Sequence, residues 1–198
     1  KAQEKLTLLN EQQVELQADM MVIADEQKVL AIAGIMGGLD SSVTDDTQDI
    51  FLESAFFAPL AIAGRARRFG LHTDSSQRYE RGVDFELPML AMHRACELIQ
   101  SFAGGEFGPI TVVEQAVLLP KREAIALQQI QVDQLLGYAV SGDFIADALT
   151  RLGCVVETKA QGEWLVIPPS HRYDMVIYQD LIEEVARIHG YDNIQISL

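Results

Sequence analysis

Glu53 is a carboxylate in an apolar stretch of sequence, a setting that suits it to chemistry. Six of the eight residues in positions 50–57 are apolar, so we expect its side chain to be partly desolvated. Desolvation disfavours the charged form, so such a group either has a raised pKa or has a cationic partner. Two readings stay open: a polar group that recognises a ligand, or a structural ion pair with Arg65, Arg67 or Arg78.

Four carboxylates near the end of the sequence form a second candidate site. Asp180, Glu183 and Glu184 have the i, i+3, i+4 spacing of one helical face, and Asp174 lies near the expected start of that helix. Like charges repel, so this grouping favours an external cation, either Mg²⁺, which prefers oxygen ligands, or a basic partner surface. A solvated acidic face with Arg187 as its partner is an equally open reading.

Positive charge and hydroxyl groups are concentrated between these two sites. Five of the fifteen Lys and Arg residues lie in positions 65–81, which requires a local partner, either an anionic ligand or internal carboxylates. The stretch 71–76 carries hydroxyls, an imidazole and a carboxylate on an expected loop, which suits a small ligand but equally suits turns and caps. The glycines of Gly34-Ile-Met-Gly-Gly38 indicate a bend where the backbone closely approaches another group.

The composition limits the class of protein. The chain has 198 residues, of which 48% are apolar, enough for one or two packed cores. Its formal charge of −14 argues against nonspecific nucleic-acid binding, which needs excess Lys and Arg. No apolar run approaches a membrane span, so no membrane partner is expected. Cys96 and Cys154 lack the spacing of a zinc site or a disulfide framework.

The apolar pattern predicts an α+β fold of two modules, residues 1–118 and 119–198. In the first we expect a mixed or antiparallel sheet with packed helices. Its elements are two hairpins within 6–35, a strand over 50–54, a helix over 59–69 closed by Gly70, and a helix over 87–103 capped by Asp84.

The second module has the element order of a winged helix. We expect a strand over 124–127, helices over 132–136 and 143–152, a hairpin over 154–167, and a helix over 176–189. Residues 119–198 contain six Lys and Arg against eleven Asp and Glu. Because an acidic module is poorly suited to gripping a phosphate backbone, a protein-contact or scaffold role is favoured.

Several long motifs resemble one known family. They are Gly34-Ile-Met-Gly-Gly38, Leu52-Glu-Ser-Ala-Phe-Phe57, Arg67-Arg-Phe-Gly-Leu-His-Thr-Asp74 and Arg78-Tyr-Glu-Arg-Gly-Val-Asp84, then Arg151-Leu-Gly-Cys-Val, Pro168-Pro-Ser-His-Arg-Tyr-Asp-Met and Asp180-Leu-Ile-Glu-Glu-Val-Ala-Arg. They occur in the order found in bacterial phenylalanyl-tRNA synthetase beta subunits, where an editing module precedes a winged-helix-like module. The resemblance covers essentially the whole chain and implies an internal piece of a larger subunit.

The resemblance implies an editing pocket that hydrolyses tyrosine from mischarged tRNA(Phe). By this resemblance Glu53 reads the tyrosine hydroxyl, Gly37 lines the pocket, and Thr73 and Ser75 lie near the substrate. Ser75 departs from the family's usual alanine, Gln77 from its histidine and Phe85 from its proline. No general base is identified, so hydrolysis is expected to depend on an ordered water.

The resemblance also implies cofactors and partners for the assembled enzyme. Asp174, Asp180, Glu183 and Glu184 match a family Mg²⁺ site shared with the alpha subunit, and ATP is a substrate of the whole enzyme. The expected assembly is a cytoplasmic alpha2beta2 heterotetramer that binds tRNA(Phe), in which the fragment alone does not aminoacylate. The alternative is a noncatalytic RNA-binding or subunit-interaction scaffold. A free-standing deacylase is disfavoured by the continuous run into the second module.

Overall fold

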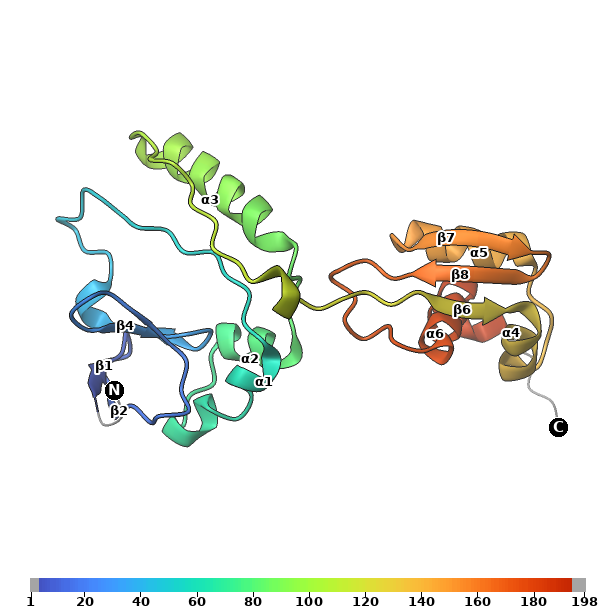
Figure 1. Ribbon diagram of the computed structural model, residues 1–198, viewed down its shortest axis with the longest axis horizontal. Helices are drawn as coiled ribbons and strands as arrows, with labels where there is room; N and C mark the ends of the chain where they lie inside the picture. The colour runs from blue at the N-terminus through green and yellow to red at the C-terminus, as the bar shows by residue number, and fades with distance from the viewer. Residues whose placement is uncertain (1–3, 194–198) are drawn as a thin grey trace. The chain divides into compact units, whose positions relative to one another are not determined.

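The structure, a computed structural model, describes residues 4–193 and divides into two compact units (Figure 1). The first unit ends at Ile110 and the second begins at Thr111, so the division lies slightly before the predicted boundary at residue 118. Each unit has its own cluster of buried apolar side chains. The two are therefore described separately.

The first unit begins with two small antiparallel sheets. β1 (Lys5–Thr7) pairs with β2 (Gln13–Glu15), and β4 (Val29–Ile32) lies between β3 (Val22–Ala24) and β5 (Met36–Gly37). A single bridge between Leu8 and Gly38 joins the first hairpin to the end of the second sheet. The two predicted hairpins are thus confirmed.

Burial, not strand length, stabilises these sheets. Strands this short are marginal in isolation, whereas each fully buried Leu or Ile contributes roughly 1.5–3 kcal/mol. Leu6 and Val14 face each other across the first hairpin and are both buried. The cluster around them also includes Leu8, Ile32, Ile35, Ile62 and Leu71. It fixes the register, because a one-residue slip would turn these side chains to solvent.

The segment between the sheets and the long helix differs from the prediction in three ways. The predicted strand over 50–54 is wrong, because these residues have no regular structure and Phe51 is 97% exposed. The predicted helix over 59–69 is interrupted: α1 (Pro59–Ile62) ends before Gly64, whose φ is +77°, and a 3-10 helix (Ala66–Phe69) follows. A helix, α2 (Asp74–Arg81), begins within the loop expected over 71–76.

The long helix α3 (Leu87–Ala103) has the predicted bounds. Its N-cap is Glu86, not the predicted Asp84, whose carboxylate accepts a hydrogen bond from the Glu86 backbone N–H at 3.0 Å. No residue of α3 is buried. Two further 3-10 turns, Leu39–Ser41 and Ala116–Leu118, lie outside the main elements.

The second unit follows the predicted winged-helix order. Its elements are β6 (Ile125–Gln128), α4 (Gln129–Leu136), α5 (Gly142–Arg151), β7 (Val155–Ala160), β8 (Glu163–Ile167), α6 (Tyr178–His189) and the 3-10 turn Tyr191–Asn193. The antiparallel sheet has the order β6-β8-β7. The predicted elements are confirmed, although α4 begins three residues earlier than expected.

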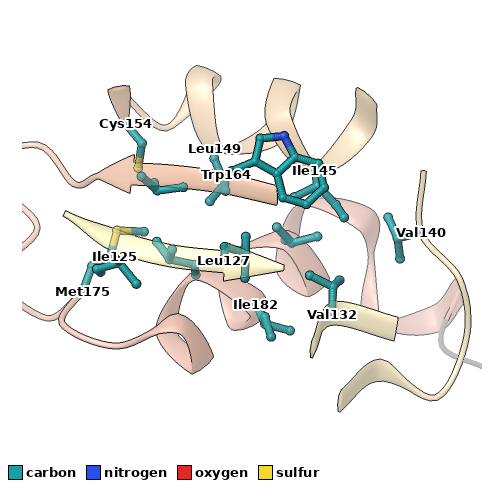
Figure 2. Packing of buried hydrophobic residues seen from close by; sticks show 13 residues of the cluster. Ile125, Leu127, Val132, Val140, Ile145, Leu149, Cys154, Trp164, Met175 and Ile182 are labelled. Carbon is teal, nitrogen blue, oxygen red and sulfur yellow. The ribbon is translucent and has the colours of Figure 1, made fainter. Parts of the chain in front are cut away.

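Alternation along β6 and β8 builds the core of this unit. Leu127 pairs with Trp164 and Ile125 with Val166, and all four side chains are buried. Figure 2 shows Trp164 beside Ile145 and Leu149 of α5, and Ile182 of α6 in the same cluster. Among the described residues no helix has the length and apolar character needed to cross a membrane.

Candidate functional site

The glycine bend after β4 makes a close approach that only glycine allows. Gly34 has φ +64°, in the left-handed region that side chains disfavour. A Cβ placed there would lie 3.2 Å from Phe57 Cδ2, 3.2 Å from Tyr79 Cγ and 3.3 Å from Ile62 Cδ1. The bend is therefore in contact with both the irregular segment that carries Glu53 and the helix α2.

Thr73 fastens the start of α2 to this bend. As the N-cap it accepts a hydrogen bond from the Ser76 backbone N–H at 3.0 Å, and its hydroxyl donates to the Ile35 carbonyl at 2.8 Å. The Ser76 hydroxyl completes the cap from a buried position. Ser75 lies in the first turn of α2, half-buried, with no hydrogen bond to its hydroxyl from any residue between 4 and 193.

Glu53 is exposed, yet partial desolvation of its carboxylate raises its pKa above the ordinary value of a glutamate. Desolvation by the surrounding apolar segment is the cause. The alternative of an ion pair is wrong: Arg65 pairs with Asp19 and Arg67 with Glu80, and within residues 4–193 no cation lies within salt-bridge distance of Glu53. The Glu53 carboxylate thus remains available to a ligand.

Tyr79 is the residue at this site that the sequence did not single out. Its hydroxyl donates to the Ala55 carbonyl at 3.0 Å, and its ring lies 5.2 Å from that of Phe57, centroid to centroid. Burial raises the pKa of Tyr79, and the charge of Glu53 raises it further. In the sequence, the one indication that Tyr79 belongs to this site is its position four residues after Ser75, which places both on the same face of α2.

Gly37 is placed less centrally than predicted. It pairs with Ala31 across the sheet, and a Cβ there would meet only Leu9, at 3.2 Å from its Cδ1. Thr73 and Ser75 lie at the start of α2, and the bend at Gly34 contacts both α2 and the segment that carries Glu53. Gly37 lies in β5, and its Cβ position does not contact either element. A separate concavity of about 250 Å³ elsewhere on this unit, lined by residues such as Lys5, Lys28 and Gly38, contains none of the four predicted residues.

The cationic segment is largely neutralised by its own chain. Arg68 lies 2.9 Å from an Asp19 oxygen and Arg65 lies 3.8 Å from the other. The hydrogen bond from Arg68 lowers the pKa of Asp19. Arg78 is exposed, and within the described part of the chain no carboxylate pairs with it. Internal carboxylates thus explain much of the charge cluster at 65–81.

In the second unit, two arginines lie among the predicted metal ligands. Arg172 donates to Asp174 at 2.6 Å and to Glu184 at 2.8 Å, and Arg187 Nε donates to Glu184 at 3.0 Å. Burial alone would raise the pKa of Glu184, but the hydrogen bonds from the arginines outweigh it and lower the pKa. The hydrogen bond from Arg172 likewise lowers the pKa of Asp174.

The other two carboxylates of this set, Asp180 and Glu183, lie in different surroundings. Asp180 Oδ2 accepts from the backbone N–H groups of Val176 at 2.8 Å and Ile177 at 2.9 Å, which caps the start of α6. Glu183 is exposed. Between residues 4 and 193 no three His, Cys, Asp or Glu side chains converge so as to hold a metal ion.

Two family models match the chain, one over each unit. A B3/4 domain matches residues 1–104, and a tRNA synthetase B5 domain matches residues 125–191. The chain is 82% identical over 197 residues to the phenylalanine–tRNA ligase beta subunit of Acinetobacter baylyi. It is 55% identical over 192 residues to that of Psychrobacter arcticus and 52% identical over 191 residues to that of Vibrio cholerae.

The chain belongs to the phenylalanine–tRNA ligase beta subunit family. The alignments cover 100%, 97% and 96% of this chain but only 25%, 24% and 24% of the respective relatives, so it spans about a quarter of their length. The relatives are thus named as subunits of an aminoacyl-tRNA synthetase, a ligase. The predicted pocket residues lie in the B3/4 match and the predicted metal ligands in the B5 match.

A Mg²⁺ ion does not fit the four B5-domain carboxylates as this family member places them. The guanidinium of Arg172 occupies the position between Asp174 and Glu184 that a bridging cation requires. Asp180 already accepts two backbone hydrogen bonds. A metal at these residues requires that Arg172 move away from Asp174 and Glu184.

Proposed function

We propose that the first unit is the editing module of a phenylalanine–tRNA ligase beta subunit, which hydrolyses tyrosyl-tRNA(Phe). The observation that carries this proposal is Glu53, a desolvated carboxylate without an ion-pair partner between residues 4 and 193, next to the Phe57–Tyr79 aromatic pair. An aromatic wall with one unpaired acceptor suits a phenol, since the ring packs and the hydroxyl binds the carboxylate.

This arrangement favours tyrosine over phenylalanine for a physical reason. A site built to hydrogen-bond a hydroxyl strongly rejects the analogue that lacks it, because its own polar group is then left unpaired. Glu53 is exposed in the free protein, so it becomes such a group once a bound side chain covers it. Because the phenylalanine side chain lacks the hydroxyl that Glu53 binds, correctly charged phenylalanyl-tRNA is spared from hydrolysis.

Hydrolysis in this module is proposed to use water as the nucleophile. Water attacks the ester carbonyl carbon, the bond between that carbon and the ribose oxygen breaks, and the ribose oxygen takes up a proton from the water to become a hydroxyl, which releases tyrosine and tRNA. The Thr73 hydroxyl already donates to Ile35 and accepts from the Ser76 backbone N–H, so only one lone pair remains for the water. The Ser75 hydroxyl is available as a donor to the water or to the substrate carbonyl.

The assembled enzyme is proposed to contain an alpha subunit in an alpha2beta2 arrangement, to bind tRNA(Phe), and to use ATP and Mg²⁺ in the cytoplasm for aminoacylation. The names of the relatives support the alpha partner, because they denote a beta subunit of a ligase. The four acidic residues of the second unit remain proposed ligands only in that assembly. The exposed Arg78 is the candidate contact of the first unit for a phosphate group.

A scaffold role is the second candidate, favoured by the surface of α3. This helix has no buried residue, and Leu90 and Phe102 on it are 68% and 84% exposed. Exposed apolar side chains of this kind mark contacts with other protein. In this alternative the apolar face of α3 binds another part of the subunit, and the pocket residues serve only packing.

Glu53→Gln in the full-length subunit, assembled with its alpha partner, separates these candidates. The substitution keeps the size of the side chain and removes its charge. We expect hydrolysis of tyrosyl-tRNA(Phe) to fall at least tenfold, since a charge-assisted hydrogen bond contributes roughly 1.5–3 kcal/mol. The matched control is Glu97→Gln on α3, an exposed carboxylate paired with Arg94. Unchanged hydrolysis in Glu53→Gln, with the fold intact, refutes Glu53 as the group that reads the hydroxyl, whereas a folded parent enzyme that does not hydrolyse tyrosyl-tRNA(Phe) supports the scaffold role.

A further inference from the structure

The segment that carries Glu53 has no sheet to hold it in place. Residues 50–58 have no regular structure, so ladder hydrogen bonds do not fix the direction of the Glu53 side chain. Two side-chain hydrogen bonds tie the segment to helices. The Ser54 hydroxyl donates to the Pro88 carbonyl at 2.9 Å, and the Tyr79 hydroxyl donates to the Ala55 carbonyl at 3.0 Å.

Tyr79 holds the segment at a second point as well. Its ring lies against the Phe57 ring, with centroids 5.2 Å apart and planes tilted by 50°. The bend at Gly34 lies against both rings. A Cβ on Gly34 would lie 3.2 Å from Phe57 Cδ2 and 3.2 Å from Tyr79 Cγ. The backbone on either side of Ala55 is therefore clamped between α2 and the glycine bend.

Tyr79 also belongs to the helix that bears the other predicted pocket residues. Thr73 caps α2, Ser75 lies in its first turn, and Tyr79 follows one turn later. Because Thr73 is bonded to Ile35, the helix itself is fixed to the bend. Tyr79 therefore sets the position of Glu53 relative to Thr73 and Ser75.

We propose that Tyr79 is a positioning residue that places the Glu53 carboxylate for recognition of the substrate hydroxyl, by holding Ala55 with its own hydroxyl and Phe57 with its ring. This inference rests on the proposed editing function. Tyr79 acts on the specificity of the reaction through Glu53, and not by touching the ester. Loss of its hydroxyl therefore affects substrates that use Glu53 and spares those that do not.

The test is Tyr79→Phe in the full-length subunit assembled with its alpha partner. The substitution removes one oxygen and keeps the ring. Single-turnover hydrolysis is measured with tyrosyl-tRNA(Phe) and phenylalanyl-tRNA(Phe). We expect kcat/KM for the tyrosyl ester to fall roughly three- to tenfold, which is the effect of one lost hydrogen bond, and that for the phenylalanyl ester to change less than twofold. The matched control is Tyr138→Phe, which removes a hydroxyl bonded to His189 in the second unit.

A double variant and an exchange measurement complete the test. Tyr79→Phe combined with Glu53→Gln is expected to lose no more activity than Glu53→Gln alone, because both changes act on one interaction. Hydrogen exchange of the amides at 53–57 is expected to be faster in Tyr79→Phe than in the parent protein. Equal losses for both esters, additive losses in the double variant, or unchanged exchange overturn the inference.

The outcomes separate this inference from the proposed function. If the parent enzyme does not hydrolyse tyrosyl-tRNA(Phe), the editing function is refuted, and the exchange rates at 53–57 alone decide whether Tyr79 holds the segment. If the parent enzyme is active and Tyr79→Phe matches it for both esters, the positioning role is refuted and the editing function stands.

Discussion

Replacing Arg172 by Gln is expected to destabilise the second unit, because it removes the cation shared by Asp174 and Glu184. The side chains of Arg172 and Glu184 are 21% and 11% exposed, so their ion pair is shielded from water. Removing one partner of a buried pair costs about 3–5 kcal/mol, because the remaining charge is left uncompensated. Here Glu184 keeps Arg187 and Asp174 is half-exposed, so we expect about half of that cost, roughly 2 kcal/mol.

The fluorescence of Trp164 gives a direct assay. It is the only tryptophan in the sequence, and it is buried in the core of the second unit, so its thermal transition reports on that unit alone. For a unit of this size, a loss of about 2 kcal/mol lowers Tm by roughly 10 °C. The matched control is Arg151→Gln, whose pair with Asp147 is largely exposed and contributes little.

The pH dependence of the effect has a definite sign. Because the pKa values of Asp174 and Glu184 are lowered in the folded state, their stabilisation is present above their unfolded pKa values, near pH 4, and is lost as pH falls through the folded values. The difference in Tm between parent and Arg172→Gln must therefore shrink below about pH 4. A decrease in Tm of less than 2 °C for Arg172→Gln at neutral pH refutes this reasoning. A metal chelator that lowers the Tm of the parent protein more than Arg172→Gln does also refutes it.

The remaining predictions concern the first unit. Gly34→Ala is expected to cost about 1 kcal/mol for its positive φ and a further 1–3 kcal/mol for crowding against Phe57 and Tyr79, whereas Gly70→Ala, with a similar φ and open space around it, costs only the first part. Calorimetry compares the two, and equal losses contradict the prediction. Glu53→Gln is expected to raise Tm slightly at pH 8 and to leave it unchanged near pH 4, because the cost of the charged, partly desolvated carboxylate appears as pH rises above its unfolded pKa and is complete above its raised folded pKa. An equal effect at both pH values contradicts this.

The sequence predicted elements well where local signals agreed with burial. In the second unit, apolar alternation at Trp164 and Val166 and the left-handed Gly137 and Gly153 gave the strands and helix ends that the structure has. Helix ends of this kind are set by local backbone preferences, which a single sequence displays. The two hairpins of the first unit were predicted for the same reason.

Predictions failed where tertiary partners decide the structure. The apolar pattern of residues 50–54 predicts a strand, but among residues 4–193 no strand pairs with them. The apolar periodicity of residues 59–69 predicted one continuous helix. The structure interrupts it at Gly64, whose φ of +77° is not helical.

The candidate sites show the same limit. Spacing correctly grouped Asp180, Glu183 and Glu184 on α6 but said nothing of Arg172, which lies twelve residues before Glu184 and binds it. Tyr79 was missed because its partners, Ala55 and Gly34, are far from it in sequence. Long-range contacts of this kind are not visible in local patterns.

The irregular backbone around Glu53 has a consequence for how substrate preference evolves. On a strand, the pleat dictates which face a side chain occupies, so any adjustment disturbs every neighbour along the ladder. Residues 50–58 are held instead by side-chain contacts such as those of Ser54 and Tyr79, so a change in one of these contacts redirects one carboxylate while the hairpins keep their register. Under the proposed function, substitutions at these few contacts are therefore a route by which substrate preference changes without rebuilding the domain.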